Sequence, residues 1–92
     1  MTEVDLSYSP TAVSPPGDTI ADLLEERDMS QAELARRLGT APKVINEIIR
    51  GKAPISPSMA VNLEQVLGSP ASFWLTRQAR FDASRAARGG RS

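Results

Sequence analysis

Residues 30–52 read SQAELARRLGTAPKVINEIIRGK, a stretch in which two short amphipathic segments flank a glycine. In a helix-turn-helix, two short helices cross at a steep angle through a tight turn, and the second helix enters the major groove of DNA. The crossing requires a small residue where the helices approach, which Ala35 supplies, and a turn residue that tolerates positive φ, which Gly39 supplies. It also requires an apolar residue of the second helix, here Ile45, to pack back onto the first. This register favours a DNA-binding motif, with an inert helical hairpin as the alternative.

Local signals predict where these two helices begin and end. Ser30 followed three residues later by Glu33 is typical of a capping box at a helix start. Gly39 is expected to end the first helix, and the second is expected over residues 42–50, with Gly51 ending it.

The rest of the chain predicts three more helices and no strand, so the fold class is all-α with five helices. Apolar residues at helical spacing predict a helix over about Asp18–Arg27, where Asp28 follows as a residue that tolerates the left-handed conformation. Ser56-Pro57 and Ser69-Pro70 each read as a serine N-cap before a proline at the first helical position, and the last helix is expected to reach about Arg88. The expected organisation is a flexible N-terminal arm (1–16), a helix-turn-helix domain (17–88) and a disordered tail (89–92).

The composition excludes several classes of protein. The 92 residues contain neither cysteine nor histidine, which excludes a disulfide framework, a zinc finger and histidine-based nucleophile activation. The remaining carboxylates and lysines form no recognisable catalytic arrangement, so we expect neither an enzyme nor a cofactor or metal. No apolar run approaches the roughly 20 residues of a membrane helix, and the acidic N-terminus does not resemble a signal peptide. We therefore expect a cytoplasmic protein.

The formal net charge is zero, but the charges are unevenly distributed. Residues 1–29 carry seven acids against one base, whereas residues 30–52 and 53–92 each carry five bases against two acids. A phosphate backbone responds to local potential rather than to net charge. The asymmetry is compatible with nucleic-acid binding, and chance unevenness in a small domain is the alternative.

If the second helix enters the major groove, side chains of its N-terminal part meet base edges. Lys43 could donate to guanine, Asn46 could pair with adenine, and Glu47 could accept from cytosine. Gln31, at the start of the preceding helix, is placed to contact phosphate. The predicted DNA-binding residues are Gln31, Thr40, Pro42, Lys43, Asn46, Glu47, Arg50 and Lys52, the last two as phosphate contacts.

Some charged residues of the motif have a structural explanation as well. Arg36 and Arg37 are as compatible with the solvated surface of the supporting helix as with phosphate contacts. An acid near phosphates, such as Glu47, usually weakens binding unless it reads a base.

Proteins with this motif usually act as dimers on half-sites about 34 Å apart. The predicted dimer interface is the apolar cluster of the last helix, which consists of Phe73, Trp74, Leu75 and Phe81. A domain this small also needs aromatic residues for its own core, and that is the alternative role of the same cluster.

Residues 16–82 closely resemble the HigA-type antitoxins of the lambda-repressor-like helix-turn-helix superfamily. The resemblance rests on Pro16-Gly17, SQAELARRLG, INEIIRGK, the Pro-Ile-Ser-Pro link at 54–57, and SFWL followed by Gln78-Ala79-Arg80-Phe81. SQAELARRLG alone indicates only the superfamily, whereas the link and the SFWL segment narrow the resemblance to the antitoxins.

The resemblance implies a homodimer that represses its own operon at a palindromic operator in double-stranded DNA. It also implies a HigB-type ribonuclease toxin of the RelE-like fold that the protein neutralises by direct binding. Because such a toxin is expected to be basic, we expect Asp22, Glu25 and Glu26 to face it; an ordinary solvated helix face is the alternative. A stand-alone dimeric regulator without a toxin, and an antidote that no longer binds an operator, are the alternative functions.

The sequence departs from the family pattern just before the second helix of the motif. The position before Pro42 commonly holds a serine or threonine that caps this helix, and here it is Ala41. Losing an N-cap hydroxyl costs roughly 1 kcal/mol, and a phosphate contact is lost with it. Thr40 could replace the hydroxyl if the cap moved one residue earlier.

Overall fold

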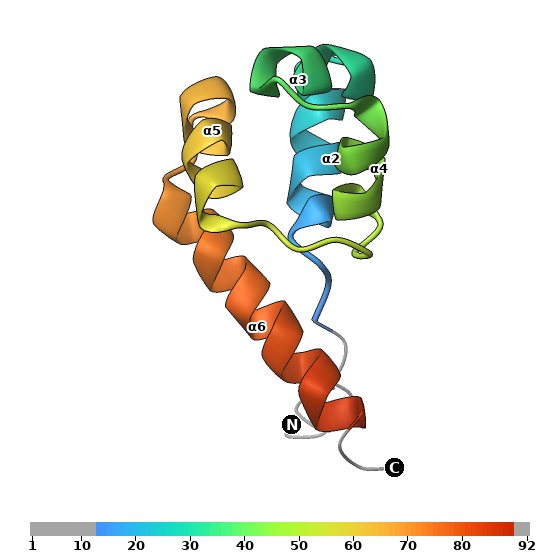
Figure 1. Cartoon of the computed structure of the whole chain (residues 1–92), viewed down its shortest axis with the longest axis vertical. Coiled ribbons are helices and arrows are strands. Elements are labelled where there is room, and N and C mark those ends of the chain that lie inside the picture. Colours follow the sequence, from blue (N-terminus) through green and yellow to red (C-terminus); the bar gives the residue numbers. More distant parts are fainter. Residues whose placement is uncertain (1–12, 90–92) are drawn as a thin grey trace, which may run out of the picture.

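Five helices follow one another in residues 13–89, the part of the chain that the computed structural model describes (Figure 1). They are α2 (Gly17–Glu26), α3 (Gln31–Leu38), α4 (Pro42–Ile49), α5 (Pro57–Leu67) and α6 (Ala71–Gly89). These described residues contain no strand, which confirms the all-α prediction. α2, α3 and α4 lie together at one end of the molecule, whereas α6 begins beside α5 and runs out beyond the other helices.

Two of the predicted serine N-caps are present. The Ser30 hydroxyl accepts a hydrogen bond from the Glu33 amide at 3.0 Å, and the Ser56 hydroxyl accepts one from the Met59 amide at 3.1 Å. The capping box is only half formed, because the Glu33 carboxylate bonds to arginines one turn further on. The predicted helix starts are therefore confirmed. The second hydrogen bond of the capping box, from the Ser30 amide to the Glu33 carboxylate, is not formed.

The last helix begins differently from the prediction. α6 starts at Ala71, and the Ala71 amide donates to the carboxylate of Glu64 at 2.9 Å. The predicted Ser69 N-cap is therefore wrong: a side chain of α5 accepts the first free amide of α6. This contact also fixes the turn between the two helices.

The left-handed residues that end α2 and α3 were predicted correctly. Gly39 has φ of 72°, and it donates to the Arg36 carbonyl while Thr40 donates to the Ala35 carbonyl, which is the Schellman arrangement. Asp28 has φ of 57° and ends α2 in the same way. It is the one described non-glycine residue with positive φ.

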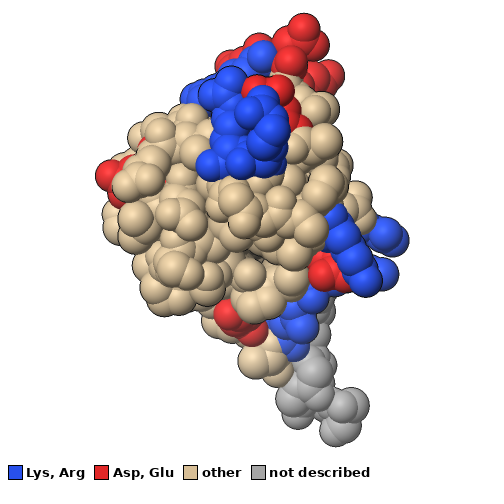
Figure 2. All heavy atoms as spheres, turned by 45° about the horizontal axis from the view of Figure 1, so that its top comes forward, with Lys and Arg blue, Asp and Glu red and all other residues tan. Residues whose placement is uncertain are grey.

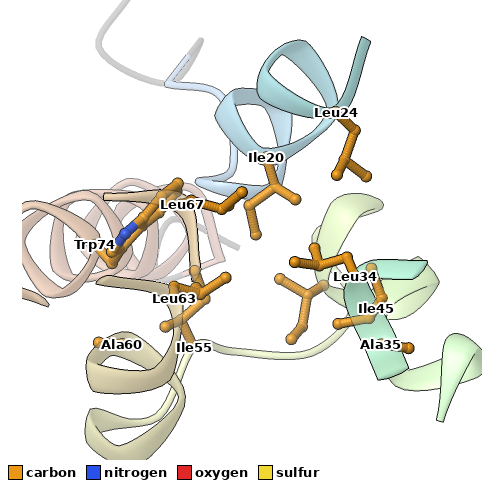
Figure 3. Close-up of a cluster of buried hydrophobic side chains, with 11 residues drawn as sticks. Ile20, Leu24, Leu34, Ala35, Ile45, Ile55, Ala60, Leu63, Leu67 and Trp74 are labelled. Atoms are coloured by element: carbon orange, nitrogen blue, oxygen red, sulfur yellow. The ribbon is translucent and has the colours of Figure 1, made fainter. Parts of the chain in front are cut away.

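All five helices contribute to one apolar core (Figure 3). Its largest fully buried side chains are Ile20, Leu34, Ile45, Leu63 and Trp74. Ile45 packs with Leu34 across the α3–α4 crossing, and Ala35, 1% exposed, lies in the same cluster. The three residues expected to fix the geometry of the motif therefore lie where the prediction requires them.

Polar contacts attach the outer elements to this core. The buried amide of Gln78 on α6 accepts a hydrogen bond from the Ile55 amide at 2.8 Å and donates to Asp82 at 2.9 Å. This ties α6 to the link between α4 and α5. Arg27, after α2, donates to the Leu67 carbonyl at the end of α5 at 2.7 Å. Polar side chains thus hold α2 and α6 to neighbouring segments of the chain.

The predicted arm and tail lie mostly outside the described residues, which exclude 1–12 and 90–92. The described end of the arm contacts α6, because Arg77 donates to the Pro15 carbonyl at 3.0 Å and Pro16 is buried. The flexibility of both termini stays a prediction.

Candidate nucleic-acid interface

α4 begins immediately after an extended residue. Ala41 has φ of −85° and ψ of 149°, makes no side-chain cap, and is followed by Pro42 at the first helical position. The cap does not move to Thr40, so that suggestion is wrong. Proline has no backbone N–H, so it leaves no unpaired donor at the first helical position, and its fixed φ suits the first turn of a helix. α4 therefore starts without a hydroxyl.

The structure brings predicted DNA-binding residues from the start of α3 and from α4 together. Pro42 and Lys43 are exposed, and Asn46 and Gln31 are half-buried. The side-chain amide of Asn46 donates to the side-chain oxygen Oε1 of Gln31 at 3.3 Å. The contact orients both amides and leaves the Asn46 oxygen to accept and the Gln31 nitrogen to donate. Sequence reasoning placed both residues at the interface but missed that they touch.

A second basic group lies at the other end of α4. Arg50 and Lys52 are exposed on either side of Gly51, which has φ of 76°. The Lys52 amide donates to the Glu47 carbonyl at 2.8 Å, and the Gly51 amide donates to the Ile48 carbonyl at 3.1 Å. This turn holds the backbone between the two basic side chains in one conformation.

The basic residues of α3 are partly neutralised. Arg37 Nη2 lies 2.8 Å and Arg36 Nη2 3.1 Å from the same carboxylate oxygen of Glu33. Hydrogen bonds from Arg37 and then Arg36, with the Arg36 charge, hold the pKa of Glu33 below its usual value. Both guanidinium groups keep donors that could reach phosphate, so either of their predicted roles stays open.

Figure 2 shows how these charges are distributed on one face of the molecule. Basic side chains form two separate groups, each next to acidic side chains, with an uncharged surface between them. Such an arrangement favours contacts to two separate stretches of a phosphate backbone rather than to one continuous stripe.

The predicted dimer residues fall into two environments. Trp74 is 0% and Phe81 8% exposed, so both belong to the core of the monomer, whereas Phe73 is 37% exposed and Leu75 half-buried. A hollow of about 310 Å³ beside Phe73 is lined by Ser72, Thr76, Arg77 and Arg80. The interface stays a prediction, and Phe73 has the most area left for a partner.

The acids predicted to face a toxin lie together on α2. Asp22, Glu25 and Glu26 are exposed at helical spacing, and none forms an ion pair within residues 13–89. Glu25 also lines a hollow of about 300 Å³ between α2 and α3, with Leu24, Asp28, Met29 and Ser30. This surface is acidic, because its exposed acids outnumber its one base, Arg27, whose guanidinium donates to the Leu67 carbonyl.

A helix-turn-helix family model matches residues 20–74. The chain therefore belongs to the helix-turn-helix family, whose members have a DNA-binding regulator fold. It is 40% identical over 63 residues to the uncharacterized HTH-type transcriptional regulator YddM of Escherichia coli K12, and the match covers 68% of this chain and 67% of YddM. Virulence-associated protein A of Dichelobacter nodosus is 38% identical over 63 residues, and the chain spans 62% of its length.

The structural neighbours are HigA-family antitoxins and related antidotes, which confirms the resemblance seen in the sequence. The HigA-family addiction-module antidote of Coxiella burnetii is 28% identical with a TM-score of 0.79, over 84% of this chain and 85% of that one. The antitoxin HigA of Pseudomonas aeruginosa, solved with the higBA promoter, is 32% identical with a TM-score of 0.77, over 86% and 88%.

Within residues 13–89 no helix combines the length and the apolar character that crossing a membrane would require.

Proposed function

We propose that this protein is the antitoxin of a type II toxin-antitoxin system, which represses its own operon as a dimer and neutralises a RelE-like ribonuclease toxin by direct binding. The observation that carries the DNA half is the pairing of Asn46 with Gln31 beside the exposed Lys43. Gln31 and Lys43 lie in the first turns of the two motif helices, and Asn46 follows Lys43 one turn along α4, in the region where base edges and phosphates are contacted in proteins of this class. The structural neighbour from P. aeruginosa was solved with promoter DNA, which supports the same role here.

Removing the two base-reading side chains should abolish sequence preference. In Lys43→Ala/Asn46→Ala, each lost base contact is expected to cost about 1–3 kcal/mol of binding free energy, with a smaller effect on scrambled DNA. Fluorescence anisotropy with the gene's own upstream DNA and a scrambled duplex measures both affinities. Gln65→Ala, which removes an exposed amide from α5, is the control. Equal binding of wild type and double variant, without sequence preference, would show that the recognition-helix assignment is wrong.

The dimer is proposed to form through α6. Phe73 is an exposed aromatic side chain beside an open hollow, and α6 runs out beyond the other helices (Figure 1). Exposed aromatic residues are enriched in protein interfaces. A dimer would also present two recognition helices to the two halves of a palindromic operator.

The toxin is proposed to contact the acidic face of α2. Asp22, Glu25 and Glu26 have no ion-pair partners in the described part of the chain, so their charges remain available to a basic protein. Complementary charge mainly accelerates association and makes it sensitive to salt.

Charge reversal tests the toxin contact. In Asp22→Lys/Glu25→Lys/Glu26→Lys, association with the product of the adjacent toxin-like gene should slow by 10-fold or more at low salt, because steering is lost. Co-purification and surface-binding kinetics at two salt concentrations measure this. Glu64 accepts the first amide of α6 and Asp82 accepts a hydrogen bond from the buried Gln78, so neither acid is suitable as a control. Gln65→Lys, which adds a positive charge at an exposed position of α5, is the control. Unchanged kinetics and salt dependence in the triple variant would refute this surface.

A stand-alone transcriptional regulator is the second candidate, because YddM, 40% identical over 63 residues, is named as an uncharacterized HTH-type transcriptional regulator. The two functions separate cleanly in a pull-down with the neighbouring gene product. Operator binding without any captured toxin would favour the regulator.

A further inference from the structure

The inward-facing stripe of α6 continues past the core. Trp74, Gln78, Phe81 and Arg85 recur at i, i+4, i+7 and i+11, so they share one helix face. The first three are buried at 0%, 7% and 8% exposure. Arg85 follows them in the last two turns of α6, and it is exposed. It therefore points to the side of α6 on which the domain lies.

Two contacts place the Arg85 side chain beside the turn after α4. Its Nη1 donates a long hydrogen bond, 3.5 Å, to the Gly51 carbonyl. Its guanidinium carbon lies 5.2 Å from the centre of the Phe81 ring, within the range of a cation–π contact. Phe81 in turn packs close to Gly51, since a side-chain carbon added there would lie 3.4 Å from the ring. The arginine is thus held at this turn rather than extended into solvent.

Three positive side chains therefore surround one turn. Arg50 and Lys52 are the sequence neighbours of Gly51, and both are exposed. Within residues 13–89, neither they nor Arg85 form an ion pair. The closest acid along α6, Asp82, accepts a hydrogen bond from Gln78. Arginine keeps several donors when one is used, so Arg85 can bond to Gly51 and to an anion together.

We propose that Arg85 contacts the phosphate backbone of DNA, so that the binding surface extends from the recognition helix through the Gly51 turn onto α6. The inference rests on the proposed DNA binding and adds a contact from a helix outside the helix-turn-helix. Its role is positioning and affinity rather than sequence reading, because a phosphate contact carries no base information. Sequence analysis assigned Arg50 and Lys52 to phosphate and did not assign Arg85.

The salt dependence of binding measures the contact directly. Each phosphate contact contributes about −0.9 to the slope of log K against log salt for duplex DNA. For Arg85→Gln per protomer we expect the slope to become shallower by about 0.9, so that the loss of affinity between 50 and 200 mM salt is about 3.5-fold smaller than for wild type. The affinity loss should be equal on the upstream duplex and on a scrambled one. Arg85→Lys keeps the charge and should retain most of the slope.

Arg27→Gln is the control, because it removes the same charge from a side chain that donates to the Leu67 carbonyl and is assigned no contact with DNA or with the partner protomer. Its slope should equal that of wild type, with the oligomeric state of every variant checked by sedimentation. An unchanged slope in Arg85→Gln, or an equal change in Arg27→Gln, would overturn the inference while leaving the proposed function intact. Failure of the wild type to bind either duplex would overturn both.

Discussion

Gly17→Ala should destabilise the protein by about 3 kcal/mol or more, the upper end of what overpacking costs. A side-chain carbon on Gly17 would lie 2.7 Å from the carbonyl carbon of Ile49, and closer still to the Ile48 oxygen and the Ile49 α-carbon. All three are backbone atoms, so no rotamer change can relieve the contact. α2 would have to move away from α4, and the recognition helix would lose its support. Chemical denaturation followed by circular dichroism measures the change.

Gly68→Ala is the control for this prediction. Gly68 ends α5 with φ of 97°, and a side-chain carbon added there meets nothing within 4 Å. Its replacement should cost only the strain of the left-handed conformation, about 1–2 kcal/mol. If Gly17→Ala were no more destabilising than Gly68→Ala, the close approach of α2 to α4 would be wrong. DNA affinity should fall in the Gly17 variant and stay unchanged in the Gly68 variant.

Features set by neighbours in sequence were predictable. Ser30 and Ser56 cap their helices, Gly39 and Asp28 end theirs, and Ile45 is buried, because each depends on residues within one or two turns. The helix boundaries follow from these local signals. The fold class and the position of the motif could therefore be read from the sequence.

Features set by distant residues could not be predicted. Gly17 appears in sequence only as a helix start, and its packing against α4 depends on how two helices separated by α3 come together. Ser69 looks like an N-cap, but Glu64 from α5 accepts the first amide of α6 instead. Glu33 fits a capping box, yet two arginines one turn away compete for its carboxylate.

The candidate site shows the same division. Lys43 and Asn46 were placed on the recognition helix from its register, and both lie at its N-terminal part. The Asn46–Gln31 contact and the position of Arg85 at Gly51 join residues 15 and 34 positions apart. The spacing of Arg85 after Phe81 was the one available signal, since it continues the apolar stripe of α6.

Trp74→Ala should remove about 3–5 kcal/mol of stability, a large share of what a small domain has. Trp74 is 0% exposed and is the largest fully buried side chain, lying between α5, α6 and the rest of the core (Figure 3). Trp74→Phe should cost less, about 1–2 kcal/mol, because the indole Nε1 is buried without a hydrogen-bond partner and its removal leaves no acceptor unpaired. Thermal and urea unfolding must be followed by circular dichroism, since Trp74 is the single tryptophan of the chain.

Substitution of the neighbouring Phe73 distinguishes an effect on the stability of the monomer from an effect on the formation of the dimer. Phe73 meets the Trp74 ring edge-on, with ring centres 5.0 Å apart, but is 37% exposed beside the hollow on α6. Phe73→Ala should therefore cost about 1–2 kcal/mol of stability, less than Trp74→Ala, since more than a third of the side chain already lies in water. The same change should weaken the proposed dimer, which sedimentation at several protein concentrations measures. A Phe73 variant as unstable as Trp74→Ala would assign Phe73 to the core, and a stable variant that assembles like wild type would place the dimer interface elsewhere on the surface.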